Sequence, residues 1–250
     1  LRLNGPFCTH CGLKKPIGSP HEEIEMPDIK KHVRINDILL GPLERPALQW
    51  LAARMPGWMF PDHLTIIGTF GAVLIFVSYW LTNYDKNFLW IASLGFVINW
   101  FGDSLDGTLA RYRNIQRPKY GFFIDHTVDA FNEALIILGF GLSPYLRFEI
   151  ASLLLIGYLM LSVLVYVRTC VKGEFVISYV GFGPTEMRVI AILANTLIFF
   201  FGNPAVTLFG NPTTIFDVVG LLIALVLFIV FIVSTYSQAR ELSRIDPQTE

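Results

Sequence analysis

The chain is organised around Asp103-Ser-Leu-Asp106-Gly107-Thr-Leu-Ala110-Arg111, followed after a nine-residue gap by Gly121-Phe-Phe-Ile-Asp125-His126-Thr-Val-Asp129. The four aspartates form two pairs, spaced three and four residues apart, and on a helix either spacing puts both members on one face. The basic residues in the gap predict a polar turn between two helices. Four converging carboxylates repel one another and are costly at membrane depth. We therefore expect two hard divalent cations, Mg²⁺ or Mn²⁺, at this turn.

The composition is that of an integral membrane protein. Hydrophobic residues make up 53% of the 250 residues and charged residues only 16%, whereas soluble domains carry about 25% charged residues. The net charge of −1 argues against nucleic acid as a partner. Because the chain begins at Leu1 rather than Met, we expect further sequence upstream, where a targeting segment would lie.

Long apolar segments predict six membrane crossings, since a helix needs about 20 residues to span the hydrocarbon. They are residues 64–84, 87–102 with a continuation past Asp103, 121–142, 150–167, 189–202 and 218–239. Residues 34–58 mix apolar side chains with arginines, which is typical of an amphipathic helix lying on the membrane surface. The expected fold is an all-α integral membrane protein, with six transmembrane helices and this N-terminal amphipathic surface helix.

The distribution of basic residues predicts the orientation, because cytoplasmic loops are rich in Lys and Arg. If the turn 112–120 is cytoplasmic, all 19 Lys and Arg residues except Lys86 and Arg147 fall on the cytoplasmic side. Both termini and the acidic site then face the cytoplasm. The expected organisation is a cytoplasmic N-terminal segment (1–58), a catalytic membrane domain (59–243) and a cytoplasmic tail (244–250).

This topology also predicts the depth of the site. Asp103 lies roughly 24 Å along its helix from the outer surface, at 1.5 Å per residue, in a hydrocarbon layer about 30 Å thick. The carboxylates would therefore need a water-filled cup that opens to the cytoplasm.

The acidic stretch resembles the CDP-alcohol phosphotransferase family, whose motif reads Asp-x-x-Asp-Gly-x-x-Ala-Arg, a gap, then Gly-x-x-x-Asp-x-x-x-Asp. Every fixed residue of that motif is present, although the gap has nine residues instead of the usual eight. The extra residue falls in the turn, where insertions are best tolerated. A purely structural network of acids and bases would not need the small residues and the arginine at these offsets.

The resemblance implies a role for each motif position. Asp103, Asp106 and Asp125 would ligate the metal ions, and Asp129 would be both a ligand and the general base. The acceptor hydroxyl would attack the β-phosphate of a CDP-linked substrate, and CMP would leave. The expected CDP-binding residues are Gly107, Ala110, Arg111 and Gly121. The family often has Pro-Asn-x-x-Thr before its first membrane helix; here Asp62 replaces the Asn, and Thr65 is the remaining nucleotide contact.

Two further features bear on the substrate. Asp125-His126-x-x-Asp129 is similar to the Asp-His-Gly-Cys-Asp of choline and ethanolamine phosphotransferases, and Gly183-Pro-Thr-Glu186-Met-Arg188 resembles that branch too. Glu186 would face a cationic head group and Arg188 a phosphate. The alternatives are a packing role for His126 and a Thr185 helix cap with a solvated ion pair. The donor is therefore either a CDP-amino alcohol with a lipid acceptor, which these residues favour slightly, or CDP-diacylglycerol with a soluble alcohol.

Other hypotheses remain at this level. Intramembrane acids also occur in ion- or proton-coupled transporters, although here they cluster at one end of the predicted helices. Cys8 and Cys11 form a Cys-x-x-Cys knuckle that offers two ligands for Zn²⁺; the alternative is two ordinary thiols in an N-terminal tail. The family resemblance also implies a homodimer.

Overall fold

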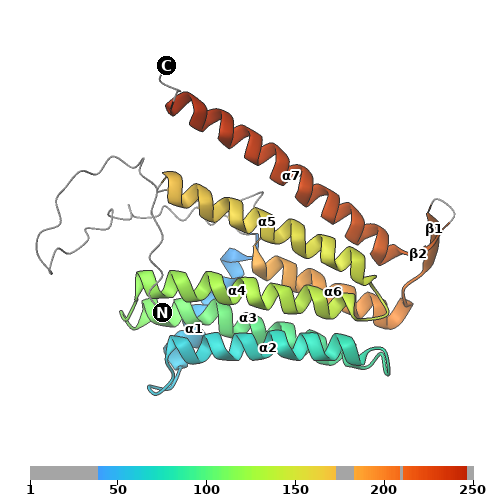
Figure 1. Cartoon of the computed structure of the whole chain (residues 1–250). Coiled ribbons are helices and arrows are strands. Elements are labelled where there is room, and N and C mark those ends of the chain that lie inside the picture. The colour runs from blue at the N-terminus through green and yellow to red at the C-terminus, as the bar shows by residue number, and fades with distance from the viewer. Residues whose placement is uncertain (1–38, 173–182, 209–210, 247–250) are drawn as a thin grey trace, which may run out of the picture. The chain divides into compact units, whose positions relative to one another are not determined.

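The computed structural model describes residues 39–172, 183–208 and 211–246, all within the unit formed by residues 32–250. The elements in chain order (Figure 1) are α1 (Gly41–Arg54), α2 (Pro61–Leu81), α3 (Phe88–Tyr112), α4 (Pro118–Gly141), α5 (Phe148–Lys172), α6 (Pro184–Phe201), β1 (Ala205–Leu208), β2 (Asn211–Thr214) and α7 (Ile215–Ile245). The six long helices coincide with the six apolar segments, and α3 continues unbroken through the first half of the acidic motif. The short hairpin β1–β2 lies between α6 and α7.

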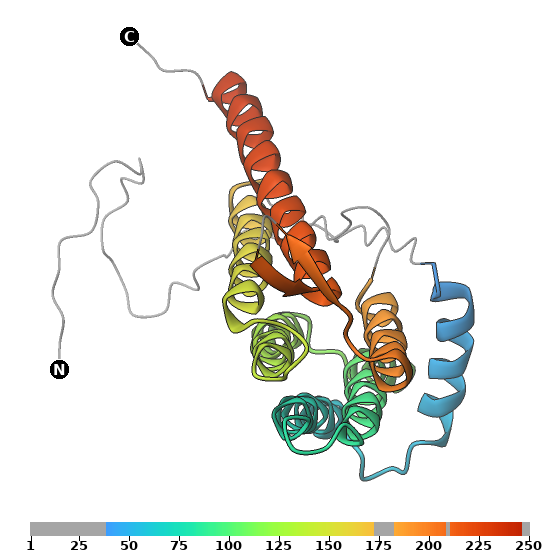
Figure 2. The ribbon, with the colours of Figure 1, turned by 90° about the vertical axis from the view of Figure 1, so that its right-hand side faces the viewer.

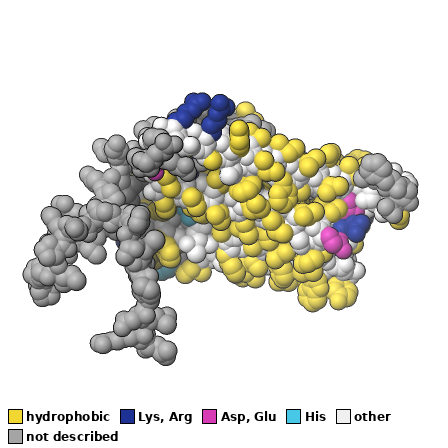
Figure 3. All heavy atoms as spheres, turned by 45° about the horizontal axis from the view of Figure 1, so that its top comes forward, with side chains coloured by type: hydrophobic (Ala, Val, Ile, Leu, Met, Phe, Trp, Pro, Cys, Tyr) yellow, Lys and Arg dark blue, Asp and Glu magenta, His cyan; other side chains and the backbone are white. Residues whose placement is uncertain are grey.

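Five of the described helices, α2, α3, α5, α6 and α7, are long and apolar enough to cross a membrane. Helix α4 has 24 residues, but Asp125, Asp129 and Glu133 make it more polar than these five. Figure 3 shows hydrophobic side chains over most of the visible face, with charged side chains at its margins. An exposed apolar surface of this extent fits contact with lipid. The chain is therefore a multi-pass membrane protein built from α-helices.

Helices α2 and α3 approach each other so closely that only glycine fits at the contact. A Cβ atom on Gly71 would lie 2.5 Å from the backbone nitrogen of Asn99, and one on Gly102 would overlap the backbone of Gly68. Small residues permit such close packing between membrane helices. The Asn99 amide donates a hydrogen bond to the Gly68 carbonyl over 2.9 Å. This contact fixes the register of the two antiparallel helices and brings Thr65 level with the acidic end of α3.

The other helices pack around this pair. Helix α4 packs against α2, and α6 packs against α3. Helix α5 packs against α4, and α7 packs against α5. Figure 2 shows this arrangement in a view nearly along the axes of most helices. Helices α2, α4 and α6 all begin, and α3 ends, at the same end of this arrangement. We call it the site end, because the acidic motif lies there. The hydrophobic core nearer the opposite end is formed by Ile75, Tyr79, Leu89, Ala92, Phe96 and Ile198.

Helix α1, the described part of the expected surface helix, docks on α3 and α6 at the site end. The Glu44 carboxylate accepts hydrogen bonds from the Trp100 indole and the Thr185 hydroxyl, each 2.7 Å long. The Arg113 guanidinium donates to backbone carbonyls just after α1, at Met55, Pro56 and Met59. An apolar cluster completes the contact; it comprises Leu48, Ala52, Leu64, Leu105 and Leu109.

Candidate metal centre

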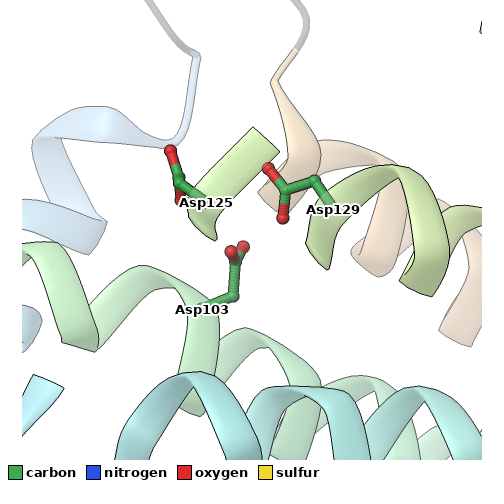
Figure 4. A group of neighbouring side chains, drawn as sticks. All are labelled: Asp103, Asp125 and Asp129. Carbon is green, nitrogen blue, oxygen red and sulfur yellow. The ribbon is translucent and has the colours of Figure 1, made fainter. Parts of the chain in front are cut away.

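Three aspartates from two helices meet at the site end. Asp103 comes from α3, and Asp125 and Asp129 come from successive turns of α4, with all three carboxylates around one space (Figure 4). One oxygen from each lies within 4.8 Å of the others. Two local features cause this convergence: the four-residue spacing aligns the α4 pair, and the glycine contact between α2 and α3 sets the height of Asp103.

Asp106, the fourth motif aspartate, is directed to a neighbouring helix. Its Oδ2 accepts a hydrogen bond of 2.6 Å from the Thr65 hydroxyl on α2, and its Oδ1 accepts one of 2.5 Å from the backbone of Gly107. Asp106 therefore lies outside the group of three that is close enough to share one ion. It nevertheless lines the same cleft as the other three aspartates.

The cleft between α2, α3 and α4 is small, with a volume of about 10 Å³, which is roughly the space that one water molecule or one ion needs. Its lining is almost entirely oxygen-bearing or small; it comprises Thr65, Gly68, Asp103, Asp106, Asp125, Val128, Asp129 and Asn132. Oxygen donors of this kind are the ligands that Mg²⁺ and Mn²⁺ prefer. The cleft thus has the oxygen-rich lining expected from the sequence.

Negative charge exceeds positive charge in this cleft. At an effective dielectric constant of 20, each carboxylate pair at 4.8 Å repels by about 3 kcal/mol. Arg188 forms an ion pair with Asp103, and the His126 ring nitrogen Nδ1 lies 3.6 Å from Asp125 Oδ2. One guanidinium does not balance four carboxylates, so cations bound from solution are the natural complement of the site.

Arg188 connects the cluster to α6. Its Nη2 donates to Asp103 Oδ2 over 2.6 Å, and its Nε donates to Asn99 Oδ1 over 2.8 Å. Arg188 thus orients a candidate metal ligand and keeps one buried guanidinium nitrogen, Nη1, without a hydrogen-bond partner among the described residues.

The residues expected to bind the nucleotide lie next to the cluster, on the exposed side of α3 and at the start of α4. The Arg111 guanidinium folds back along α3, so that a Cβ on Gly107 would lie 3.3 Å from its Nη1. Gly121 is exposed, and a Cβ there would meet nothing within 4 Å. Ala110, which directly precedes Arg111 on α3, is half-buried. These small residues leave open surface beside the carboxylates.

His126 and Glu186 do not line the cleft. The His126 ring stacks on Phe122 at 4.2 Å and meets Tyr166 edge-on at 5.6 Å. Its Nδ1 also lies 3.6 Å from Asp125 Oδ2, so His126 both packs against aromatic rings and contacts a candidate metal ligand. Glu186 is 4% exposed, and its carboxylate accepts hydrogen bonds from the backbone nitrogens of Leu40 and Gly183. Glu186 thereby caps α6 and fixes the entry to α1, a position that does not favour contact with a head group. The capping residue is Glu186, not Thr185.

Two residues at the site were not predicted from the sequence, and two predicted zinc ligands have no described structure. Asn99 and Asn132 flank the aspartates, and their only sequence signal is the helical spacing of four residues before Asp103 and three after Asp129. Cys8 and Cys11 lie outside the described residues. Cys170 is a free, exposed thiol.

Comparison with known proteins identifies the class of this site. The family model for CDP-alcohol phosphatidyltransferase matches residues 58–233, which is more than half of the chain. The chain therefore belongs to the CDP-alcohol phosphatidyltransferase family. This membership favours the enzyme hypothesis over the transporter hypothesis.

Three curated relatives illustrate the range of the family. The archaetidylinositol phosphate synthase of Pyrococcus horikoshii is 34% identical over 102 residues, 41% of this chain and 51% of the relative. The phosphatidylinositol phosphate synthase of Cutibacterium acnes is 38% identical over 82 residues, 33% and 37% of the two chains. Mouse cholinephosphotransferase 1 is 26% identical over 133 residues, 50% and 33% of the two chains. The chain thus matches about half of the first relative and less of the other two.

Proposed function

We propose that the protein transfers a phosphoalcohol group from a CDP-linked donor to an acceptor hydroxyl, with release of CMP. The observation that carries this proposal is the convergence of Asp103, Asp125 and Asp129 within 4.8 Å, in a cleft that also contains Asp106. Family membership supplies the reaction class. A site between a polar phase and a lipid phase suits the joining of a soluble group to a lipid.

In this proposal the four aspartates hold two divalent cations, Mg²⁺ or Mn²⁺. The donor set fits, because all four groups are hard oxygens and their charge exceeds that of the nearby Arg188. Bound cations would neutralise the diphosphate and stabilise the leaving oxygen. Asp129 removes the proton from the acceptor hydroxyl, which then attacks the β-phosphorus as the bond to the CMP oxygen breaks. Thr65 holds Asp106 in place through their 2.6 Å hydrogen bond.

The nucleotide would lie over Gly107, Ala110, Arg111 and Gly121. The absence of a large side chain at Gly121, together with its place in the first turn of α4, allows a phosphate close to the positive end of the helix dipole. Arg111 offers a planar donor fork to phosphate or ribose. Arg188 Nη1 is a second donor for the transferred phosphate.

We further propose that α4 is the sixth membrane crossing and that the site end is cytoplasmic. Helix α4 is as long as its neighbours and packs between α2 and α5, so its acids would face the cleft rather than lipid. The proposed arrangement keeps the segments named above: a cytoplasmic N-terminal segment (1–58) with α1 on the membrane surface, the membrane domain (59–243) and a cytoplasmic tail (244–250). A homodimer is proposed on the family resemblance alone.

The donor is the open part of the proposal, because the relatives include two inositol phosphate lipid synthases and a cholinephosphotransferase. Purified protein should be assayed for labelled CMP release from CDP-choline, CDP-ethanolamine and CDP-diacylglycerol, each with lipid or soluble acceptors. Mg²⁺ or Mn²⁺ should be required, and Asp129→Asn should abolish release with every donor. Glu149→Gln is the matched control, because this exposed carboxylate pairs with Arg147 at the opposite end. Release that survives Asp129→Asn would falsify the proposed base.

A further inference from the structure

Asn132 is a cleft residue to which the family motif assigns no role. It lies three residues after Asp129 and seven after Asp125, so the three side chains share one face of α4. Asn132 lines the same cleft as the aspartates and is only 5% exposed. Its Oδ1 is buried and has no hydrogen-bond partner within the described ranges.

An acceptor buried without a partner is uncommon, because it costs about 1–3 kcal/mol and most such groups in folded proteins are satisfied. The other two fully buried asparagines of the described chain obey this rule. Asn99 bonds to Gly68 and Arg188, and Asn195 bonds to Tyr79 and Ser93. Asn132 is the exception among these three, and it lines the cleft of the carboxylate cluster. The Oδ1 of Asn203 also has no partner in the described ranges, but Asn203 is less buried and bonds to Tyr145, away from the cleft.

We propose that Asn132 is a further metal-site residue, whose Oδ1 supplies a neutral oxygen to the divalent cation held by Asp125 and Asp129. This inference rests on the proposed function, because it requires a cation between these side chains. Helix α4 then contributes three oxygens at relative positions 0, 4 and 7. Mg²⁺ takes six oxygens in near-octahedral geometry, and an amide oxygen adds a ligand without adding negative charge to a cleft that already has an excess.

The test measures Mn²⁺ binding to the purified full-length protein in detergent, without nucleotide, by electron paramagnetic resonance titration. Asn132→Leu should lower Mn²⁺ affinity by about 10–100-fold, the range seen when a supporting group of a metal site is removed. Asn132→Asp keeps an oxygen at the same place and should retain at least wild-type affinity. Asn195→Leu is the matched control, because it removes a buried amide away from the cleft and should leave Mn²⁺ affinity unchanged.

A second readout separates ligation from folding. Asparagine labelled with ¹³C should give a hyperfine coupling to bound Mn²⁺ in the wild type and lose it in Asn132→Leu. Without metal, Asn132→Leu should unfold at the wild-type temperature or higher, since an orphan acceptor is replaced by an apolar group of similar shape. If the leucine variant does not fold, Asn132→Ala carries the same expectation for Mn²⁺ affinity.

The outcomes distinguish this inference from the proposed function. Wild-type Mn²⁺ affinity in Asn132→Leu, together with a loss in Asp125→Asn, overturns the role of Asn132 and leaves the metal centre intact. Wild-type affinity in Asp125→Asn overturns the metal centre itself. An equal loss in Asn132→Asp and Asn132→Leu also counts against an oxygen ligand at this position.

Discussion

Arg188 of α6 and Asp103 of α3 form a largely buried ion pair, with Nη2 and Oδ2 2.6 Å apart and side chains 12% and 19% exposed. The same guanidinium holds Asn99, and Asn99 in turn holds the Gly68 carbonyl on α2. One residue on α6 therefore controls the position of a candidate metal ligand relative to three helices. Without bound cations, this pair is the main compensation for the charge of Asp103.

Replacement of Arg188 by Met should therefore destabilise the protein more without divalent cations than with them. Removing one partner of a buried ion pair costs roughly 3–5 kcal/mol, whereas a bound cation compensates Asp103 in its place and stabilises the folded state that binds it. Thermal unfolding in detergent, with EDTA or with saturating Mg²⁺, measures this difference. The increase in melting temperature on adding Mg²⁺ should be larger for Arg188→Met than for the wild type.

Two variants control that comparison. Arg188→Lys keeps the charge but cannot bond to Asn99 and Asp103 with the same planar fork, so it should fall between Arg188→Met and the wild type. Arg147→Met removes an exposed arginine at the opposite end and should leave the Mg²⁺ effect unchanged. Equal Mg²⁺ shifts in Arg188→Met and the wild type would contradict the role of the pair.

Thr65→Val should impair turnover, because it removes the hydroxyl that holds Asp106 and leaves the shape of the side chain unchanged. A hydrogen bond to a charged group contributes about 1.5–3 kcal/mol, so kcat/KM should fall roughly 10–100-fold. Thr65→Ser should keep most of the activity. Thr69→Val, one turn further along α2, removes only a bond to the Thr65 carbonyl and serves as the control. Equal activities of Thr65→Val and Thr69→Val would show that the Asp106 contact is dispensable.

Much of the fold and of the site could be predicted from the sequence, because both follow from short-range patterns. Apolar runs of about 20 residues predict long helices without knowledge of their neighbours, and the spacing of Asp125 and Asp129 predicts that they share a face. The continuation of α3 through Asp103 and Arg111 follows from the same spacing rule. These predictions require only helical geometry.

Contacts between distant segments could not be predicted in the same way. The sequence predicted that Glu186 would face a cationic head group. In the structure its carboxylate accepts a hydrogen bond from the backbone nitrogen of Leu40, which is 146 positions away in sequence. Asn99 has only its helical spacing from Asp103 as a local signal, since its role comes from contacts with α2 and α6. The hairpin β1–β2 lies in an uncharged stretch without strand alternation, so the antiparallel pairing of Ala205 with Thr214 could not be predicted.

The buried contacts of Glu186 predict a structural defect in Glu186→Gln and no change in substrate choice. Glutamine can accept one of the two backbone hydrogen bonds with its single oxygen, so the protein should lose roughly 1–3 kcal/mol of stability. The ratio of kcat/KM for CDP-choline to that for CDP-diacylglycerol should stay as in the wild type. A selective loss of CDP-choline turnover would instead restore the head-group role. Glu149→Gln provides the exposed control.

Asp62→Asn should have little effect, although the family often has Asn at this position. Asp62 pairs with Arg117 across the mouth of the site at 2.5 Å, and both side chains are about half exposed. The hydrogen bond to Asp62 raises the pKa of Arg117, so the arginine stays charged at any working pH. Because exposed ion pairs contribute little, kcat/KM should change less than about twofold. A larger loss, insensitive to salt, would indicate that Asp62 contacts the nucleotide.

Two glycines of the site end should respond differently to alanine. Gly102→Ala places a Cβ against the backbone of Gly68, and separating α2 from α3 should cost roughly 1–3 kcal/mol and lower activity through misplacement of Asp103. Gly121→Ala meets nothing within 4 Å, so its melting temperature should equal that of the wild type. If the donor diphosphate lies against Gly121, the added methyl group should still raise the KM for the CDP donor, by roughly tenfold for about 1.4 kcal/mol of lost contact. A wild-type KM in a fully stable Gly121→Ala protein would move the nucleotide away from the start of α4.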